Sequence, residues 1–103
     1  MSEFRSGKDF AESKPVHRIT MTITNRLGLH ARAAAKFVKT AGQFDANVTV
    51  FKDGNEVSGL SIMGLMMLAA TPGSKIAVES IGNQGDDALA ALKDLVSRNF
   101  DED

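Results

Sequence analysis

The side chain best placed for chemistry is His30, which stands between an extended run and an alanine-rich helical run. The alternating pattern ends near Thr24, a turn containing Gly28 follows, and the helical pattern begins at Ala31. The first backbone N–H groups of a helix have no partner within the helix, and with the helix dipole they favour an anion. A neutral imidazole beside such an anion site can accept and release a phosphoryl group. The sequence therefore indicates phosphoryl transfer at His30.

Arg32 follows two residues after His30 and adds a permanent cation. Its guanidinium group can donate two parallel hydrogen bonds to phosphate oxygens, which would counter the charge of a phosphoryl group. The alternative is structural, because a single histidine at a helix start commonly only caps the helix or packs against it. These few residues alone leave both interpretations open.

Composition limits the possible classes of protein. The chain has 103 residues, which suits one domain, and a net charge of -1, which gives no bias towards nucleic acid. It has no cysteine and only two histidines, so we expect no disulfide and no dedicated metal site. The phosphoryl transfer indicated at His30 needs no bound cofactor. The longest apolar stretch, residues 60–70, is too short and interrupted for a membrane span, and no secretory signal is visible. We expect a cytoplasmic protein.

Periodicity divides the chain into seven elements after a polar stretch. Residues 1–14 are predicted to be a flexible N-terminal tail, and residues 15–103 a single domain. The predicted strands cover residues 16–24, 46–52, 56–59 and 75–81, and the predicted helices cover residues 31–41, 62–70 and a stretch from about 86 to 96. Asp53-Gly54 predicts a hairpin, and residues 71–74 a type II turn. This order, βαββαβα, predicts an α+β fold in which three helices cover one face of a four-stranded sheet, as in a two-layer open-faced sandwich.

Helical spacing also predicts which residues reach the core. In the first helix these are Ala34, Phe37, Val38 and Ala41; in the second they are Leu65, Leu68 and Ala69. In the last helix they are Ala88, Leu89, Leu92, Leu95 and Val96, with Phe100 closing the core. The final residues, Asp101, Glu102 and Asp103, are expected to be a solvated tail, and His17 a residue at the rim of the core.

Two surfaces near His30 are candidates for binding partners. Arg32, Lys36 and Lys39 share one helical face, which is either a solvated face or a basic stripe that steers acidic partners, and the two roles are compatible. Ser61 is predicted to cap the second helix, in which Ile62, Met63 and Met66 either pack inside or remain partly exposed. If exposed, a methionine-rich patch suits docking to several partners.

Two motifs give a more specific indication. Gly-Leu-His-Ala-Arg-Ala-Ala at residues 28–34 and Ser-Ile-Met-Gly at residues 61–64 resemble the HPr family, the histidine-containing phosphocarriers of the bacterial phosphotransferase system. The resemblance covers about residues 16–100 and implies an antiparallel sheet, with His30 opening the first helix. It further implies a carrier rather than an enzyme: enzyme I transfers a phosphoryl group from phosphoenolpyruvate to Nδ1 of His30, and IIA-type proteins accept it. His30 and Arg32 match the family's active pair.

The resemblance has two further implications. Ser61 matches the serine that an HPr kinase/phosphatase modifies in many bacteria, and a phosphate there would add negative charge to the docking patch. Ala33 stands where the family usually has proline, which leaves the helix start less rigid.

Alternatives remain for the pathway and the class of protein. Within the phosphocarriers, both sugar transport and a regulatory, nitrogen-related relay are open. A small RNA-binding domain of the RRM kind has a similar element order, but this chain has no tyrosine or tryptophan for stacking bases. A self-contained hydrolase is disfavoured because no carboxylate lies near His30 in the sequence. We expect a monomer that binds neither nucleic acid nor membrane.

Overall fold

The computed structural model describes residues 15–102, in which four strands and three helices alternate as the sequence predicts. The predicted tail, residues 1–14, lies outside this range. The strands are β1 Val16–Thr22, β2 Asn47–Lys52, β3 Asn55–Ser58 and β4 Lys75–Ile81. The helices are α2 Ala31–Ala41, α3 Ile62–Met67 and α4 Gly85–Ser97, and a short 3-10 turn, η1 Asn99–Asp101, follows α4.

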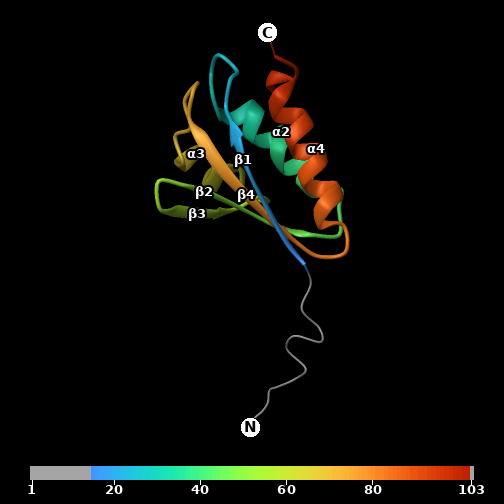
Figure 1. The fold of residues 1–103 in the computed structure, drawn as a ribbon. Helices are drawn as coiled ribbons and strands as arrows, with labels where there is room; N and C mark the ends of the chain where they lie inside the picture. The colour runs from blue at the N-terminus through green and yellow to red at the C-terminus, as the bar shows by residue number, and fades with distance from the viewer. Residues whose placement is uncertain (1–14, 103) are drawn as a thin grey trace.

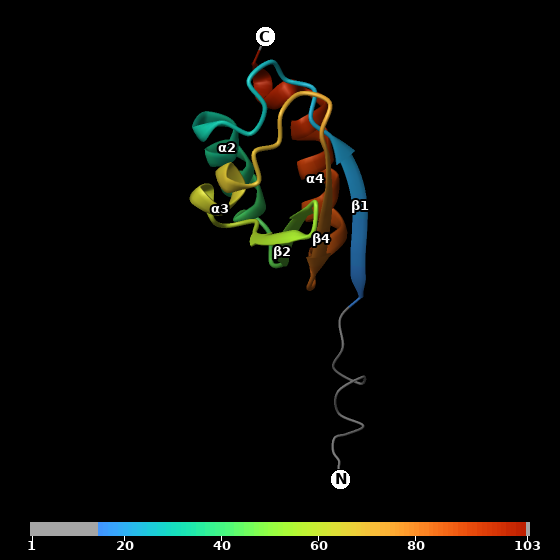
Figure 2. The same cartoon turned by 90° about the vertical axis from the view of Figure 1, so that its left-hand side faces the viewer.

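The strands form one sheet in the order β1-β4-β2-β3, and every neighbouring pair is antiparallel. Val78 on β4 pairs with Ile19 on β1 and with Val50 on β2, so β4 lies inside the sheet between them. The helices lie on one side of the sheet, as Figures 1 and 2 show from two directions. The α+β open-faced sandwich is confirmed.

Alternation along the strands explains why only one face is covered. The inward side chains of β2 and β4, Val48, Val50, Ile76 and Val78, are buried against the helices. On the other face, the Arg18 guanidinium lies 4.5 Å from the centre of the Phe51 ring. Apolar area is thus removed from water on one side, while polar groups and aliphatic stems cover the other.

The helices bury the stripes that the sequence predicts, with few exceptions. Phe37, Leu92 and Phe100 have no exposed surface, so α2, α4 and the chain end all contribute to one core. Val38 is only partly buried and packs at the edge of this core. None of the helices in residues 15–102 is long and apolar enough to cross a membrane.

The second helix is shorter than predicted. It ends at Met67, and Ala69 adopts a left-handed backbone with φ of 53°. This reversal leaves Ala69 exposed and buries Ala70 in its place, so the prediction that Ala69 reaches the core is wrong. A helical period predicts a face only while the helix continues, and here the chain turns back towards β4.

Candidate functional site

His30 lies where α2 begins. It is the N-cap residue, with an extended backbone (φ -77°, ψ 179°), and its carbonyl oxygen accepts a hydrogen bond from Ala34 N–H at 2.9 Å. Within residues 15–102 no side chain caps this helix end, so the N–H groups of Ala31, Arg32 and Ala33 have neither an intrahelical partner nor a capping group there. The imidazole keeps 24% of its surface exposed. The histidine and the anion-favouring helix start therefore lie together.

Gly28 fixes the loop that carries His30. Its φ is +65°, and a Cβ atom there would lie 2.2 Å from the carbonyl oxygen of Ala70. That same oxygen accepts a hydrogen bond from Leu29 N–H at 3.0 Å. Only glycine allows this approach, which ties the loop before α2 to the segment after α3.

The structure brings Glu102 to the histidine, a contact that no local pattern in the sequence predicts. His30 Nε2 and Glu102 Oε2 are 2.6 Å apart. The other carboxylate oxygen accepts a hydrogen bond from Asn25 Nδ2 at 3.1 Å, and the same Nδ2 donates to the Gly28 carbonyl at 2.8 Å. The predicted solvated tail is therefore wrong for Glu102, and the argument that no carboxylate lies near His30 fails with it.

A left-handed turn delivers Glu102 to this position. Asn99, Phe100 and Asp101 have φ values of 57°, 56° and 61°, although none is glycine. The Phe100 ring is fully buried, and its carbonyl oxygen accepts a hydrogen bond from Lys36 Nζ at 2.7 Å. Because this turn reverses the chain after α4, the next residue returns to the start of α2.

Side-chain contacts hold the two ends of this turn. The Thr24 hydroxyl donates to Asn99 Oδ1 at 2.5 Å, and Arg98 Nε donates to Asp101 Oδ1 at 2.9 Å. Arg98 is also paired with Asp94, one helical turn earlier. The Arg98 hydrogen bond, despite opposing desolvation, holds the pKa of Asp101 below its ordinary value, and the charge of Lys36 acts in the same direction.

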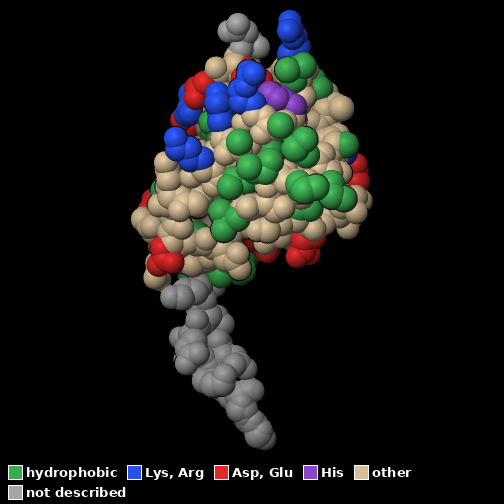
Figure 3. Space-filling model, turned by 180° about the vertical axis from the view of Figure 1, so that it is seen from behind, with side chains coloured by type: hydrophobic (Ala, Val, Ile, Leu, Met, Phe, Trp, Pro, Cys, Tyr) green, Lys and Arg blue, Asp and Glu red, His purple; other side chains and the backbone are tan. Residues whose placement is uncertain are grey.

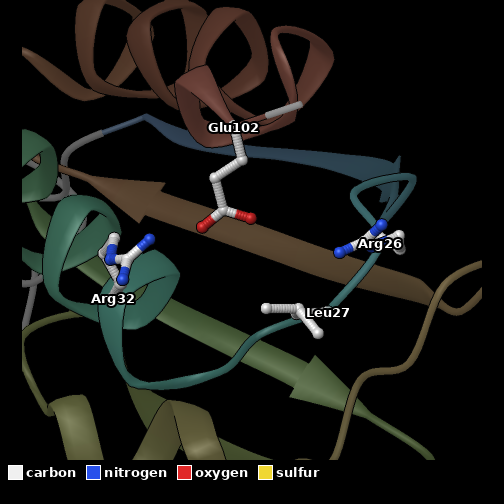
Figure 4. A pocket seen from close by; sticks show the side chains of 4 residues that line it. All are labelled: Arg26, Leu27, Arg32 and Glu102. Carbon is white, nitrogen blue, oxygen red and sulfur yellow. The ribbon is translucent and has the colours of Figure 1, made fainter.

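Glu102 lies in a surface hollow of about 210 Å³ that it shares with Arg26, Leu27 and Arg32. Figure 4 shows its carboxylate pointing into the space between Arg32 on α2 and Arg26 in the preceding loop. Sequence reasoning missed Arg26, although a basic residue two places before Gly28 was a usable signal. Two arginines at a helix start form a positive surface suited to a phosphoryl group.

The surroundings of Glu102 favour its charged form. Desolvation acts to raise its pKa, but the hydrogen bonds from Asn25 and His30, with the charges of His30 and Arg32, hold the pKa below its ordinary value. An ionised carboxylate therefore faces the imidazole under ordinary conditions.

The apolar surface beside the site is larger than the sequence suggests. Ile62, Met63 and Met66 are exposed at 40%, 74% and 42%, as one of the two alternatives predicts. We call the exposed apolar residues of this region the methionine patch; it comprises Ile62, Met63, Met66, Met67, Leu27 and Leu60. Figure 3 shows a broad apolar area with lysine, arginine and histidine side chains along its upper edge.

The lysines of the predicted basic stripe differ in their surroundings. Lys39 is exposed, whereas Lys36 is partly buried and donates to the Phe100 carbonyl oxygen. Lys36 thus braces the turn that carries Glu102. Arg32 is exposed next to His30.

Three further predicted residues can be placed. Ser61 is the N-cap of α3, as predicted, and its hydroxyl oxygen accepts a hydrogen bond from Gly64 N–H at 2.9 Å. Ala33 lies on the buried face of α2, which begins at Ala31 without a proline. Nδ1 of His17 lies 3.1 Å from Oδ1 of Asp86, and the structure shows no contact between His17 and His30 among the described residues. No group of three or more metal-ligating side chains occurs in residues 15–102.

Fold and site together define a small α+β domain that presents a histidine and two arginines at its surface, beside an exposed apolar patch. Comparison with known proteins gives the family. Residues 17–98 match the family described as "PTS HPr component phosphorylation site". The chain therefore belongs to the HPr family, the phosphocarrier proteins of the phosphotransferase system.

Individual relatives agree with this. Phosphocarrier protein HPr of Xylella fastidiosa is 47% identical over 83 residues, which cover 81% of this chain and 93% of that protein. Phosphocarrier protein NPr of Shewanella violacea is 43% identical over 82 residues, covering 80% of this chain and 90% of that protein. The crystal structure of an HPr from Thermoanaerobacter tengcongensis has a TM-score of 0.81 at 39% identity, covering 84% of this chain and 98% of that one.

Proposed function

We propose that this protein carries a phosphoryl group on His30, accepting it from enzyme I, which takes it from phosphoenolpyruvate, and passing it to IIA-type proteins. The observation that supports the proposal is the position of the ring: it is accessible and lies beside two arginines and beside three backbone N–H groups that have no partner among the described residues. Glu102 occupies Nε2, which leaves Nδ1 to bond to phosphorus. Arg32 neutralises part of the phosphoryl charge.

Partners dock on the methionine patch and on the basic side of α2. Exposed, flexible methionines adapt to different apolar partner surfaces, while Arg32 and Lys39 attract acidic groups. Lys36 contributes its charge from a fixed position, because its amino group is bound to the Phe100 carbonyl oxygen.

Ser61 is the proposed site of regulation by an HPr kinase/phosphatase. Its hydroxyl stands next to Ile62 and Met63, so a phosphate would place about two negative charges in the docking surface. Acidic partners would then bind less well while the domain stays folded. Incubation with such a kinase and ATP, followed by mass spectrometry, tests this; an unmodified Ser61 would contradict the proposal.

Sugar transport and a regulatory, nitrogen-related relay remain two candidate pathways, because relatives named HPr and NPr both match most of the chain. The Xylella HPr relative shows the somewhat higher identity, which favours sugar transport. Transfer from the labelled protein to purified IIA proteins of each pathway distinguishes them.

The central experiment is incubation with enzyme I and labelled phosphoenolpyruvate. Wild-type protein is expected to gain an acid-labile label, and His30→Ala none. His17→Ala is the matched control, since His17 pairs with Asp86 and has no contact with His30 among the interactions of the described residues. Equal labelling of the wild type and His30→Ala would overturn the proposal.

A further inference from the structure

We propose that Glu102 is a positioning residue for phosphoryl transfer: it holds the proton on Nε2 of His30 and leaves Nδ1 as the nucleophilic nitrogen. This inference rests on the proposed function, because it assigns a role in the transfer at His30. It concerns a residue that the sequence placed in a solvated tail, 72 positions away from the histidine.

The contact itself defines the tautomer. A distance of 2.6 Å between Nε2 and Oε2 is that of a short, charge-assisted hydrogen bond. An ionised carboxylate only accepts, so the shared hydrogen belongs to Nε2, and in the uncharged form of the ring the lone pair lies on Nδ1. Carboxylates orient histidines in the same way in many sites, where they fix both the ring and its proton.

Glu102 is itself held in place. Its Oε1 accepts from Asn25, whose side chain is buried and is also bound to the Gly28 carbonyl oxygen. Only 13% of the Glu102 side chain is exposed. The loop before α2 therefore fixes the carboxylate as well as the histidine.

The charges around the pair support an ionised Glu102. Arg26 and Arg32 line the same hollow from the loop and from α2, and Lys36 approaches the turn from α2. None of the residues of α3 is charged, so this helix adds no charged side chain to the surroundings of the pair. The cations offset the carboxylate, so its charge does not repel an incoming phosphoryl group unopposed.

The backbone of the turn before Glu102 is strained. Non-glycine residues rarely adopt a left-handed backbone, and Asn99, Phe100 and Asp101 do so consecutively. Such strain persists only where the surroundings enforce it, here through the buried Phe100 ring and the hydrogen bond from Lys36. The turn thus directs Glu102 back onto the histidine.

Phosphoryl transfer to Nδ1 then requires no movement of the Nε2 proton. The Nδ1 lone pair forms a bond to phosphorus, the donor's bond to phosphorus breaks, and its electron pair stays with the donor. The ring becomes cationic because it now carries both the phosphoryl group and the Nε2 proton. The Glu102 carboxylate stabilises this developing charge, and the reverse sequence returns the group to an acceptor.

The test compares Glu102→Ala and Glu102→Gln with wild type in the labelling assay with enzyme I. The first variant removes the acceptor, and the second keeps its size but removes its charge. Asp53→Asn is the control, because it removes one exposed carboxylate at the hairpin turn, where asparagine suits the left-handed backbone. Thermal unfolding of each variant checks that it is folded.

We expect Glu102→Ala to lower the rate at which enzyme I phosphorylates saturating carrier about tenfold or more, while the KM of enzyme I for the carrier is unchanged, and Glu102→Gln to fall between it and wild type. In nuclear magnetic resonance spectra without donor, wild type should show a slowly exchanging, downfield Nε2–H signal from His30. That signal should be absent in Glu102→Ala.

Two results would overturn the inference. The first is a wild-type rate in Glu102→Ala; the second is a rise in KM alone, which would assign Glu102 to docking. A wild-type protein that takes no label contradicts the proposed function instead. The Nε2–H signal requires no donor, so the contact is tested even in that case.

Discussion

At the scale of single residues, Gly28 decides how closely the loop carrying His30 approaches the segment after α3. Substitution Gly28→Ala places a Cβ 2.2 Å from the Ala70 oxygen at a φ of +65°. We expect it to lower the free energy of unfolding by about 2–4 kcal/mol, because both the contact and the backbone are unfavourable. Urea unfolding at neutral pH measures this loss.

Gly54→Ala is the matched control for that prediction. Gly54 also has a positive φ, of +83°, but a Cβ there meets no atom within 4 Å. Only the backbone cost of about 1 kcal/mol is expected. Equal losses in the two variants would show that the close approach to Ala70 does not matter.

The ionisation of Glu102 gives the fold a pH dependence. Its pKa is lower than the ordinary value, and such a carboxyl group stabilises the fold above the ordinary pKa and loses this effect as the pH falls through the folded value. We expect wild type to be more stable than Glu102→Gln at pH 7, and the difference to shrink and then vanish as the pH falls through the lowered pKa of the folded carboxyl group. Urea unfolding at several pH values tests this, and a difference that grows on acidification would contradict it.

At the scale of elements, the short helix α3 ends at Met67, and Ala69, two residues later, has a backbone conformation that alanine disfavours. Ala69 has a φ of 53° and is exposed, so a glycine there would relieve strain without losing packing. We expect Ala69→Gly to raise the free energy of unfolding by about 0.5–1 kcal/mol, as measured by urea unfolding.

The same substitution in a regular helix should have the opposite sign. Ala90 is exposed in the interior of α4, where glycine costs about 1 kcal/mol relative to alanine. Ala90→Gly is therefore expected to destabilise the protein. If both glycine variants destabilise, the left-handed backbone at Ala69 is not a source of strain.

At the scale of the whole molecule, the residues that stabilise the fold are different from those proposed to bind partners. The methionine patch lies outside the core, so polar substitutions there should leave the fold intact. For the double variant Met63→Ser and Met67→Ser, which are exposed at 74% and 79%, we expect a KM for enzyme I raised roughly tenfold. The free energy of unfolding should change by less than about 1 kcal/mol. The KM is that of enzyme I for this protein as its substrate, and initial labelling rates at varied concentrations of this protein, with a fixed catalytic amount of enzyme I, measure it.

Val16→Ser is the control, because Val16 is an exposed apolar residue on β1, which lies at the opposite edge of the sheet from β3, the strand that precedes α3. It should leave the KM unchanged. An unchanged KM in the methionine variant would remove the patch from the docking surface.

Local sequence patterns were sufficient to predict the order and type of the helices and strands. Alternation predicted the strands that bury Val48, Val50, Ile76 and Val78, and Asp53-Gly54 predicted the hairpin between β2 and β3. Helical spacing predicted α2 from Ala31 to Ala41 and its buried Phe37. These predictions succeed because period and turn chemistry depend on neighbours in the sequence. The prediction for Ala69 fails because the helix ends where the chain turns back.

The sequence by itself determined the histidine, its place at a helix start and its arginine, since each depends on residues a few positions apart. Only the tertiary structure decided that Glu102 would contact His30, that Arg26 would line the same hollow, and that Lys36 would brace the final turn. These contacts join distant parts of the chain. They form because the buried Phe100 ring and the left-handed turn direct the chain end back to α2, and no local period or motif encodes that direction.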